Sequence, residues 1–276
     1  MEDTKKMHLV LGAGFLSQQI VKCSSEVETI SVNRSGEGVT IGEKEQLVKA
    51  DILEEESLRE VKQRMPGFNG HVFFLIPPSG FGEESVASVL KGLFSVLSVG
   101  RIRGVVLVSS TGVFSESKWS TISKSSDILG VNSRVKRLLE IENAWLSSPF
   151  KVVVARLGGL YGVDRVIGKG MLLSGKSFLG TGKEYLNLIH AYDAASAILK
   201  LTQNQFVGKK FNVTDNNPPT RRAYYKYLAE KLGVEPPTFN GNPRHSYLCD
   251  SRLTWDLLGI EPLFGDYRQG LDKLFE

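Results

Sequence analysis

Short, mostly apolar runs alternate with amphipathic stretches through the first two thirds of the chain. A strand buried on both faces of a sheet is apolar throughout, so each run predicts a strand. The predicted strands are Met7–Leu11, Thr29–Val32, Leu47–Ala50, His71–Ile76, Gly104–Val108 and Val152–Leu157. The predicted helices between them are Ser17–Lys22, Glu54–Arg64, Glu83–Leu97 and Ser133–Leu146. This alternation predicts an α/β fold with a doubly wound parallel sheet, because right-handed crossovers place helices on both faces.

The pattern changes after Leu157, where Gly and Lys become frequent and the loops lengthen. A helix is expected from Thr220 to Leu232, with Thr220 as its N-cap and Gly233 just past its end. The other expected elements are a helix at Asp193–Leu201, a strand at Lys210–Val213 and a helix at Ser251–Leu258. We expect residues 1–157 to form the core with the sheet. Residues 158–276 are expected to form mainly a small C-terminal lobe of the same domain.

Composition excludes several classes of protein. Hydrophobic residues make up 41% of the 276 residues and charged residues 23%, which is usual for a globular chain and not for a disordered one. The net charge is +4 without a dense basic run, so no nucleic-acid partner is expected. No signal peptide or membrane-length apolar segment is visible, and Cys23 and Cys249 lack metal-ligand spacing. The sequence therefore predicts a cytoplasmic protein with no membrane partner and no metal site.

A glycine-rich turn, from Gly12 to Ser17, follows the first predicted strand and opens a helix. Gly12 permits a tight turn, and Gly14 lets the backbone approach a pyrophosphate. The N-terminus of the helix, at Phe15 and Leu16, offers N–H groups to that anion. Ser17 stands at the third position, where Gly or Ala is usual. The turn predicts dinucleotide binding, with an ordinary strand–helix turn as the alternative.

The second predicted strand ends in Asn33 and Arg34. An NAD site usually carries Asp or Glu here to hold the ribose 2′-hydroxyl. Without that acid a 2′-phosphate would not be repelled, and Arg34 can pair with it. We therefore expect NADP as the cofactor in preference to NAD. The alternative is that Arg34 is a solvated loop side chain.

Five segments carry further signals, and they are Ala50–Ile52, Ser109–Phe114, Arg156–Gly162, Asn187–Asp193 and Asn212–Asp215. In this order, and with the tail from Arg252 to Leu271, they resemble the short-chain dehydrogenase/reductase superfamily, in its extended, NAD-dependent epimerase/dehydratase-like branch. The resemblance implies a Rossmann fold and places the family's adenine-contacting residues at Asp51 and Ile52.

One departure from the family bears on catalysis. Active members use a Tyr-x-x-x-Lys pair on the helix after the fifth strand, where the tyrosine exchanges a proton with substrate. No tyrosine occurs from residue 111 to residue 160. Aligning Lys136 with the family lysine puts Asn132 at the tyrosine position, and aligning Glu142 with the following family glutamate puts Arg134 there. The chain resembles atypical members that have lost this pair.

Three other side chains are candidates for the chemistry. Thr111 stands at the position of the family's catalytic Ser/Thr, so its hydroxyl would orient a carbonyl. The alternative is a strand-end hydroxyl that bonds to backbone. Tyr161 and His190 are candidates for the substrate cleft, with packing in the interior as the alternative for each.

The sequence thus predicts an NAD(P)-binding epimerase/dehydratase-like protein or reductase acting on an unidentified small molecule. Residues 1–157 are the expected NAD(P)-binding Rossmann core, and residues 158–276 are expected to form mainly the substrate lobe of the same domain. Such an oxidoreductase would pass hydride between nicotinamide and a carbonyl or alcohol carbon. The alternative is a dinucleotide-sensing or ligand-binding protein without turnover, which the missing tyrosine favours. The sequence leaves open whether the chain is an enzyme and whether it forms a homodimer.

Overall fold

The chain divides into two compact units in the computed structural model, which describes residues 6–38, 40–41, 43–114, 121–122 and 132–276. Unit 1 comprises Met1–Ser109, Ser133–Ala155 and Ile198–Lys210. Unit 2 comprises Ser110–Asn132, Arg156–Ala197 and Phe211–Glu276. The chain thus leaves unit 1 after Ser109 and after Ala155, and it returns to unit 1 at Ser133 and at Ile198.

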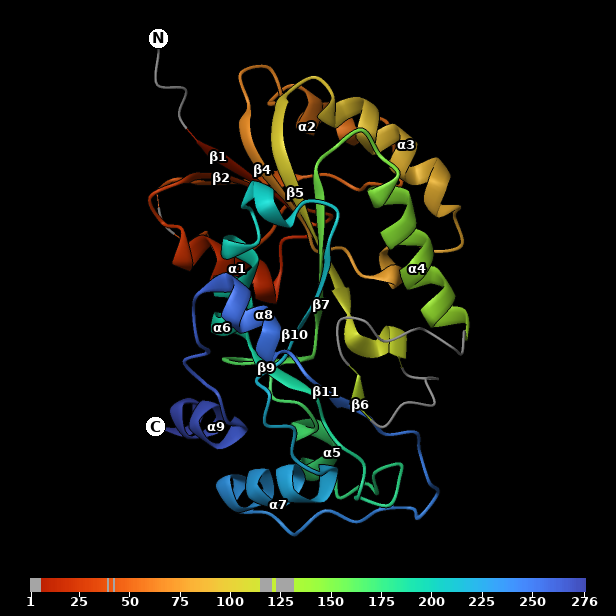
Figure 1. The fold of residues 1–276 in the computed structure, drawn as a ribbon, viewed down its shortest axis with the longest axis vertical. Helices are drawn as coiled ribbons and strands as arrows, with labels where there is room; N and C mark the ends of the chain where they lie inside the picture. Colours follow the sequence, from red (N-terminus) through yellow and green to blue (C-terminus); the bar gives the residue numbers. More distant parts are fainter. Residues whose placement is uncertain (1–5, 39, 42, 115–120, 123–131) are drawn as a thin grey trace. The chain divides into compact units, whose positions relative to one another are not determined.

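Seven parallel strands form the main sheet (Figure 1). They are β1 (Met7–Leu11), β2 (Glu28–Asn33), β3 (Glu45–Lys49), β4 (Asn69–Phe74), β5 (Arg101–Ser110), β7 (Val152–Leu157) and β10 (Lys210–Val213). Their order across the sheet is β10-β7-β5-β4-β1-β2-β3. The order reverses direction at β1, so the predicted doubly wound sheet is confirmed.

Helices and short strands connect these strands. The helices are α1 (Phe15–Cys23), α2 (Leu58–Lys62), α3 (Val86–Leu97), α4 (Ser133–Leu146), α5 (Lys169–Leu173), α6 (Ala191–Lys200), α7 (Arg221–Leu232), α8 (Arg252–Leu258) and α9 (Tyr267–Phe275). Three 3₁₀ turns are η1 (Pro78–Phe81), η2 (Thr111–Phe114) and η3 (Asn204–Phe206). In unit 2, β8 (Gly159–Tyr161) pairs with β9 (Leu188–His190), and β6 (Thr121–Ile122) pairs with β11 (Leu248–Cys249).

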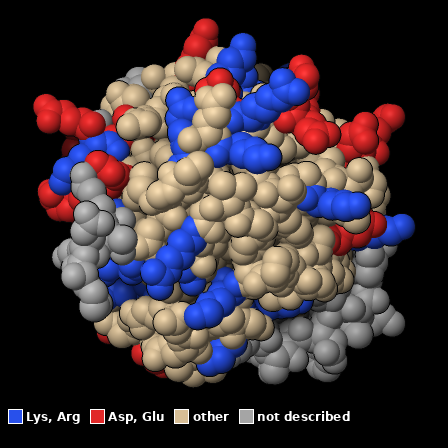
Figure 2. Space-filling model, turned by 90° about the horizontal axis from the view of Figure 1, so that it is seen from above, with Lys and Arg blue, Asp and Glu red and all other residues tan. Residues whose placement is uncertain are grey.

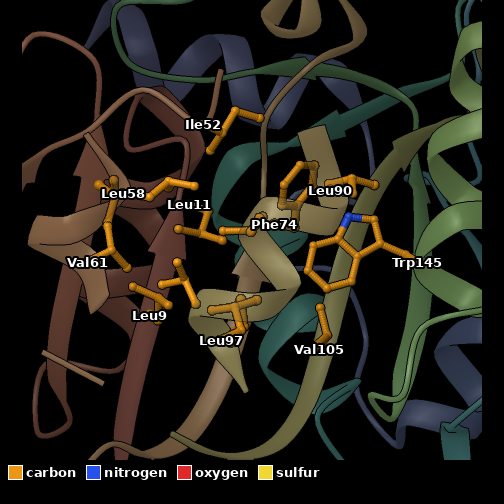
Figure 3. Close-up of a cluster of buried hydrophobic side chains, with 14 of the residues drawn as sticks. Leu9, Leu11, Ile52, Leu58, Val61, Phe74, Leu90, Leu97, Val105 and Trp145 are labelled. Carbon is orange, nitrogen blue, oxygen red and sulfur yellow. The ribbon is translucent and has the colours of Figure 1, made fainter. Parts of the chain in front are cut away.

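The core of unit 1 explains why its strands are apolar throughout. Side chains from β1, β4 and β5 pack with those of α2, α3 and α4 (Figure 3). Trp145 on α4 is fully buried, and its ring centroid lies 5.0 Å from that of Phe74 on β4. Close packing of such large side chains supplies much of the stability of a domain.

Two helix boundaries show which local signals hold. Thr220 caps α7, because its Oγ1 accepts the N–H of Ala223 at 3.2 Å, and Gly233 ends the helix with a φ of +65°. The expected helix at 54–64 is wrong in its first turn, since α2 begins only at Leu58. The backbone N–H of Asp51 donates to Ser57 Oγ at 2.8 Å, and this bond holds the preceding residues in turns.

Candidate functional site

The glycine-rich turn joins β1 to α1. Gly12 has a φ of +97°, and a Cβ there would lie 3.1 Å from the backbone nitrogen of Ile76. A side chain at this position would therefore be both strained and crowded. The N–H groups of Gly12 and Ala13 donate to the carbonyl of Val32 at 3.0 and 2.8 Å. These bonds fix the turn against the end of β2.

Gly14 is the N-cap of α1, and Ser17 holds it in place. The N–H of Gly14 donates to Ser17 Oγ, and that hydroxyl donates to the Gly14 carbonyl, both at 2.7 Å. Ser17 therefore does more than fill the usual third glycine position. A Cβ at Gly14 would meet no atom nearer than the Gly12 oxygen at 4.0 Å, so the space in front of Gly14 is open.

The loop after β2 is held by Asn33. Its Oδ1 accepts the N–H of Gly36 at 2.7 Å, and its Nδ2 donates to the carbonyl of Glu37 at 3.0 Å. The amide group is thereby used within the loop. Arg34, beside it, is exposed and forms no ion pair with any residue that the structure describes. Its guanidinium is therefore available to a ligand.

Asp51 and Ile52 follow β3. Oδ1 of Asp51 accepts the N–H of Leu53 at 3.0 Å, which leaves the other carboxylate oxygen available as an acceptor. Ile52 is only 7% exposed and belongs to the core of unit 1. A carboxylate held in this way, next to apolar side chains, suits the amino group of a planar base.

A cavity of about 500 Å³ lies at the carboxyl ends of β1 to β4, within unit 1. Ligands of open α/β sheets bind at this edge, outside the carboxyl ends of the strands. Its lining is Leu11, Gly12, Ala13, Val32, Asn33, Arg34, Ser35, Glu37, Ala50, Asp51, Ile52, Ile76, Pro77, Ser79 and Gly80. Five of the predicted cofactor residues thus come together, while Gly14, Phe15 and Leu16 follow Ala13 in the chain and begin α1.

The wall formed by the turn after β4 was not predicted from the sequence. Ile76, Pro77, Ser79 and Gly80 line the cavity there. A cluster of Pro, Ser and Gly after a buried strand is the signal for a loop at the carboxyl edge of the sheet, and it would have identified this wall. Glu37 was also missed, because nothing in its sequence context separates it from a solvated loop residue.

Thr111 and its neighbour Ser110 differ in what their hydroxyls contact. Thr111 is 4% exposed, and its Oγ1 donates to the carbonyl of Leu157 at 3.3 Å. That contact matches the backbone-bonding alternative. Ser110 is half-buried, and its Oγ accepts the N–H of Gly112 at 3.0 Å. Its proton is donated to no acceptor among the residues that the structure describes.

The two alignments of α4 with the family place different residues at the position of the family's tyrosine. Asn132, Arg134 and Lys136 are exposed. Glu142 is fully buried, where its Oε1 accepts the hydroxyl of Ser109 at 2.7 Å and its Oε2 lies 3.3 Å from Lys210 Nζ. Glu142 thus ties α4 to β5 and β10.

Tyr161 and His190 lie in the interior of unit 2, as the packing alternative describes. Their ring centroids are 5.2 Å apart in an edge-to-face arrangement. Burial lowers the pKa of His190 to about 4, so its ring is neutral at pH 7. The Tyr161 hydroxyl has no hydrogen-bond partner in the part of the chain that is described, and burial raises its pKa. Neither side chain lines the cavity of unit 1.

The described helices include none that is long and apolar enough to span a membrane. Within the same described ranges, no group of three or more His, Cys, Asp or Glu side chains is arranged to hold a metal ion.

Comparison with known proteins gives one related sequence group and many related structures. No protein-family profile matches the chain. It is 30% identical to the protein YeeZ of Escherichia coli (strain K12) over 166 residues, which are 59% of this chain. The match covers 59% of the length of this curated relative.

Two solved structures show how far the fold is shared. The UDP-N-acetylglucosamine 4-epimerase from Methanobrevibacter ruminantium M1, in complex with UDP-N-acetylmuramic acid, is 17% identical with a TM-score of 0.78 over 98% of this chain and 97% of its own. MoeE5 in complex with UDP-glucose and NAD is 18% identical with a TM-score of 0.78 over the same shares. The chain therefore has the fold of the NAD-dependent epimerases and dehydratases, the fold that its sequence resemblance predicts.

Proposed function

We propose that the chain binds a nicotinamide dinucleotide, NADP(H) in preference to NAD(H), in the cavity of unit 1. The observation that carries the proposal is that cavity itself, because the glycine-rich turn, Arg34 and Asp51 come from separate strands and line one space of about 500 Å³. That MoeE5, which has the same fold, is in complex with NAD supports the dinucleotide.

The cavity and the adjoining first turn of α1 offer separate partners to the adenine and to the pyrophosphate. The free oxygen of Asp51 would accept the adenine amino group, with Val32 and Ile76 against the faces of the base. The first turn of α1 leaves N–H groups without intrahelical acceptors, and the open space before Gly14 would let a pyrophosphate approach them. The nicotinamide supplies hydride transfer when it is bound.

Preference for the 2′-phosphate would depend on two charges in the loop that Asn33 holds. Arg34 supplies a cation without a carboxylate partner among the described residues. Glu37 lines the same cavity and brings a negative charge. Since a guanidinium pairs with phosphate through charge-assisted hydrogen bonds, Arg34 would offset the repulsion from Glu37.

Arg34→Ala is expected to weaken NADPH binding by about 1–3 kcal/mol, the range for losing a charged hydrogen bond. NADH binding should stay nearly unchanged, because NADH has no 2′-phosphate. Titration of cofactor fluorescence measures both affinities. Glu37→Gln is the companion variant and should strengthen NADPH binding alone. Equal losses for NADPH and NADH in Arg34→Ala would refute the preference.

The reaction we propose is hydride exchange with a small molecule that carries a carbonyl or hydroxyl group, and a sugar nucleotide is the class that the related folds suggest. The chain lacks a tyrosine from residue 111 to residue 160, so the proton has to come from water or another side chain. Ser110 can donate to a substrate oxygen, whereas the proton of Thr111 is used on Leu157.

Turnover of generic carbonyl compounds is expected to be absent or very slow, because positioned general acid catalysis contributes about 10²–10⁴-fold. NADPH absorbance during incubation with a carbonyl library measures it. Ser110→Ala should lower any rate found without changing NADPH affinity, and Thr111→Val tests the other hydroxyl in the same way. Robust turnover that survives both substitutions would place the chemistry elsewhere.

The missing tyrosine also supports a second candidate function, which is dinucleotide sensing without turnover. In that case NADPH would bind at the same cavity and would not be consumed with any substrate. Binding and absorbance measured on one sample separate the two functions.

A further inference from the structure

Basic residues stand at the amino ends of neighbouring strands, at the edge of the sheet opposite the cavity. We call five of them the amino-edge row, namely Lys6, Arg101, Arg103, Lys151 and Lys209. Lys6 precedes β1, Arg101 begins β5, Lys151 precedes β7 and Lys209 precedes β10. In the strand order β10-β7-β5-β4-β1 these positions belong to four of five neighbouring strands, and β4, between β5 and β1, begins with Asn69 instead.

No member of the row forms an ion pair with a carboxylate among the residues described. Four members are exposed, and Arg103 is half-buried with its Nε donating to Asn69 Oδ1 at 2.8 Å. Lys209 Nζ donates to the carbonyl of Gln205 at 2.8 Å, which leaves its charge uncompensated.

Burial lowers the pKa of His71 on β4, and the positive charges of Arg103 and Lys6 lower it further. These two cations from different strands therefore lie close enough to act on one ring. Acidic residues begin only the two strands beyond β1, with Glu28 at the start of β2 and Glu45 at the start of β3. The positive edge thus has a defined end.

The spacing of the row suits a linear polyanion. Adjacent strands lie about 4.8 Å apart, so the edge from β1 to β10 extends roughly 20 Å. One nucleic-acid strand carries a phosphate about every 3.4 Å along a helix, so several phosphates face such an edge. Figure 2 shows Lys and Arg spread over the face seen from above, with Asp and Glu mainly toward its margin. The row holds no aromatic ring on which a base would stack.

We propose that the amino-edge row binds the phosphate backbone of a nucleic acid, without contact to the bases. The surface lies at the strand ends opposite the cavity, so it does not depend on the proposed cofactor. The sequence analysis expected no such partner, because the five residues are spread from position 6 to position 209 and only the strand order brings them together.

Arg101→Glu combined with Lys151→Glu tests the proposal on the full chain. The probes are a fluorescently labelled DNA duplex and one of its single strands, titrated from about 50 to about 200 mM salt. The control combines Lys91→Glu on α3 with Lys136→Glu on α4, two exposed positions away from the row. Both double variants lower the formal net charge of +4 equally. Thermal unfolding checks that all three proteins fold.

We expect the wild-type protein to bind with an affinity that falls steeply with salt. The row variant should bind at least tenfold more weakly, and its salt slope should be smaller by about two ions released. The control should change affinity less than threefold. Binding of the duplex alone or of both probes supports the row and identifies the form bound. Equal losses of DNA affinity in the two double variants would overturn the proposal, and so would the absence of DNA binding by the wild-type protein at low salt. Binding to anionic lipid vesicles but to neither oligonucleotide would do the same.

Discussion

Gly14→Asp is expected to abolish NADPH binding while the protein stays folded. The N-cap position of α1 has room for a Cβ, since the nearest atom is 4.0 Å away. Aspartate is also a favoured N-cap residue, so α1 should lose no stability. Its carboxylate would stand where the pyrophosphate has to approach. Two like charges about 4 Å apart repel by roughly 4 kcal/mol at a partly exposed site, which corresponds to a loss of affinity of about a thousandfold.

Gly14→Asn is the matched control, because asparagine has the size of aspartate without its charge. It should reduce NADPH affinity much less than aspartate does. Fluorescence titration gives the affinities, and thermal unfolding shows whether the fold is kept. If Gly14→Asp bound NADPH as the wild-type protein does, the glycine-rich turn would have no part in the site.

The core of the fold could be predicted because strands buried on both faces appear in the sequence as mostly apolar runs. All six residues of β7 are buried, and the mostly apolar run predicted a strand over the same six residues although Arg156 lies within it. Short elements of unit 2, such as β8, α5 and β9, were not predicted, because individual hydrogen bonds rather than a long apolar run define this part of the chain. In the loop before β9, the Glu184 carboxylate accepts the N–H groups of Thr181 and Gly182 at 2.7 and 2.9 Å. Such a turn depends on individual hydrogen bonds, which no periodicity reveals.

The candidate site was predictable where a residue directly follows a strand. Gly12 and Arg34 were predicted in this way, because parallel strands end at one edge, whereas Asp51 was predicted from the family resemblance. The function of Asn33 within its loop was not, since a side chain that bonds to its own loop and one that bonds to a ligand look alike in sequence. The amino-edge row was missed for a related reason, because strand order and not sequence distance makes its members neighbours.

Asp215 is a buried acid of unit 2 with one carboxylate oxygen that lacks a partner among the described residues. It follows β10, is 1% exposed, and its Oδ2 has no hydrogen-bond partner among the residues described. Its Oδ1 accepts the N–H of Asn217 at 3.1 Å. Burial raises its pKa from 3.8 to about 8, with further increases from the charges of Asp266 and Asp193. At neutral pH the folded protein therefore holds Asp215 as the neutral acid.

This shift sets the sign of a pH effect on stability. Below pH 3.8 the acid is protonated in both the folded and unfolded states, so its ionisation does not lower the free energy of unfolding. As the pH rises toward 8, the unfolded chain ionises and the folded one does not. Each pKa unit corresponds to about 1.4 kcal/mol, so the folded state loses several kcal/mol across this window.

Asp215→Asn is expected to reverse that loss. Its amide keeps the bond to Asn217 and cannot ionise, although its buried NH₂ costs about 1–3 kcal/mol if it finds no acceptor. The variant should therefore be less stable than the wild-type protein near pH 4 and more stable near pH 8, so the two stability curves cross. Urea unfolding across this range measures the difference, in which the effects of all other groups cancel. Asp256→Asn, on an exposed position of α8, is the control and should show no such crossing. A difference between Asp215→Asn and wild type that stays constant with pH would mean that Asp215 is ionised in the folded protein.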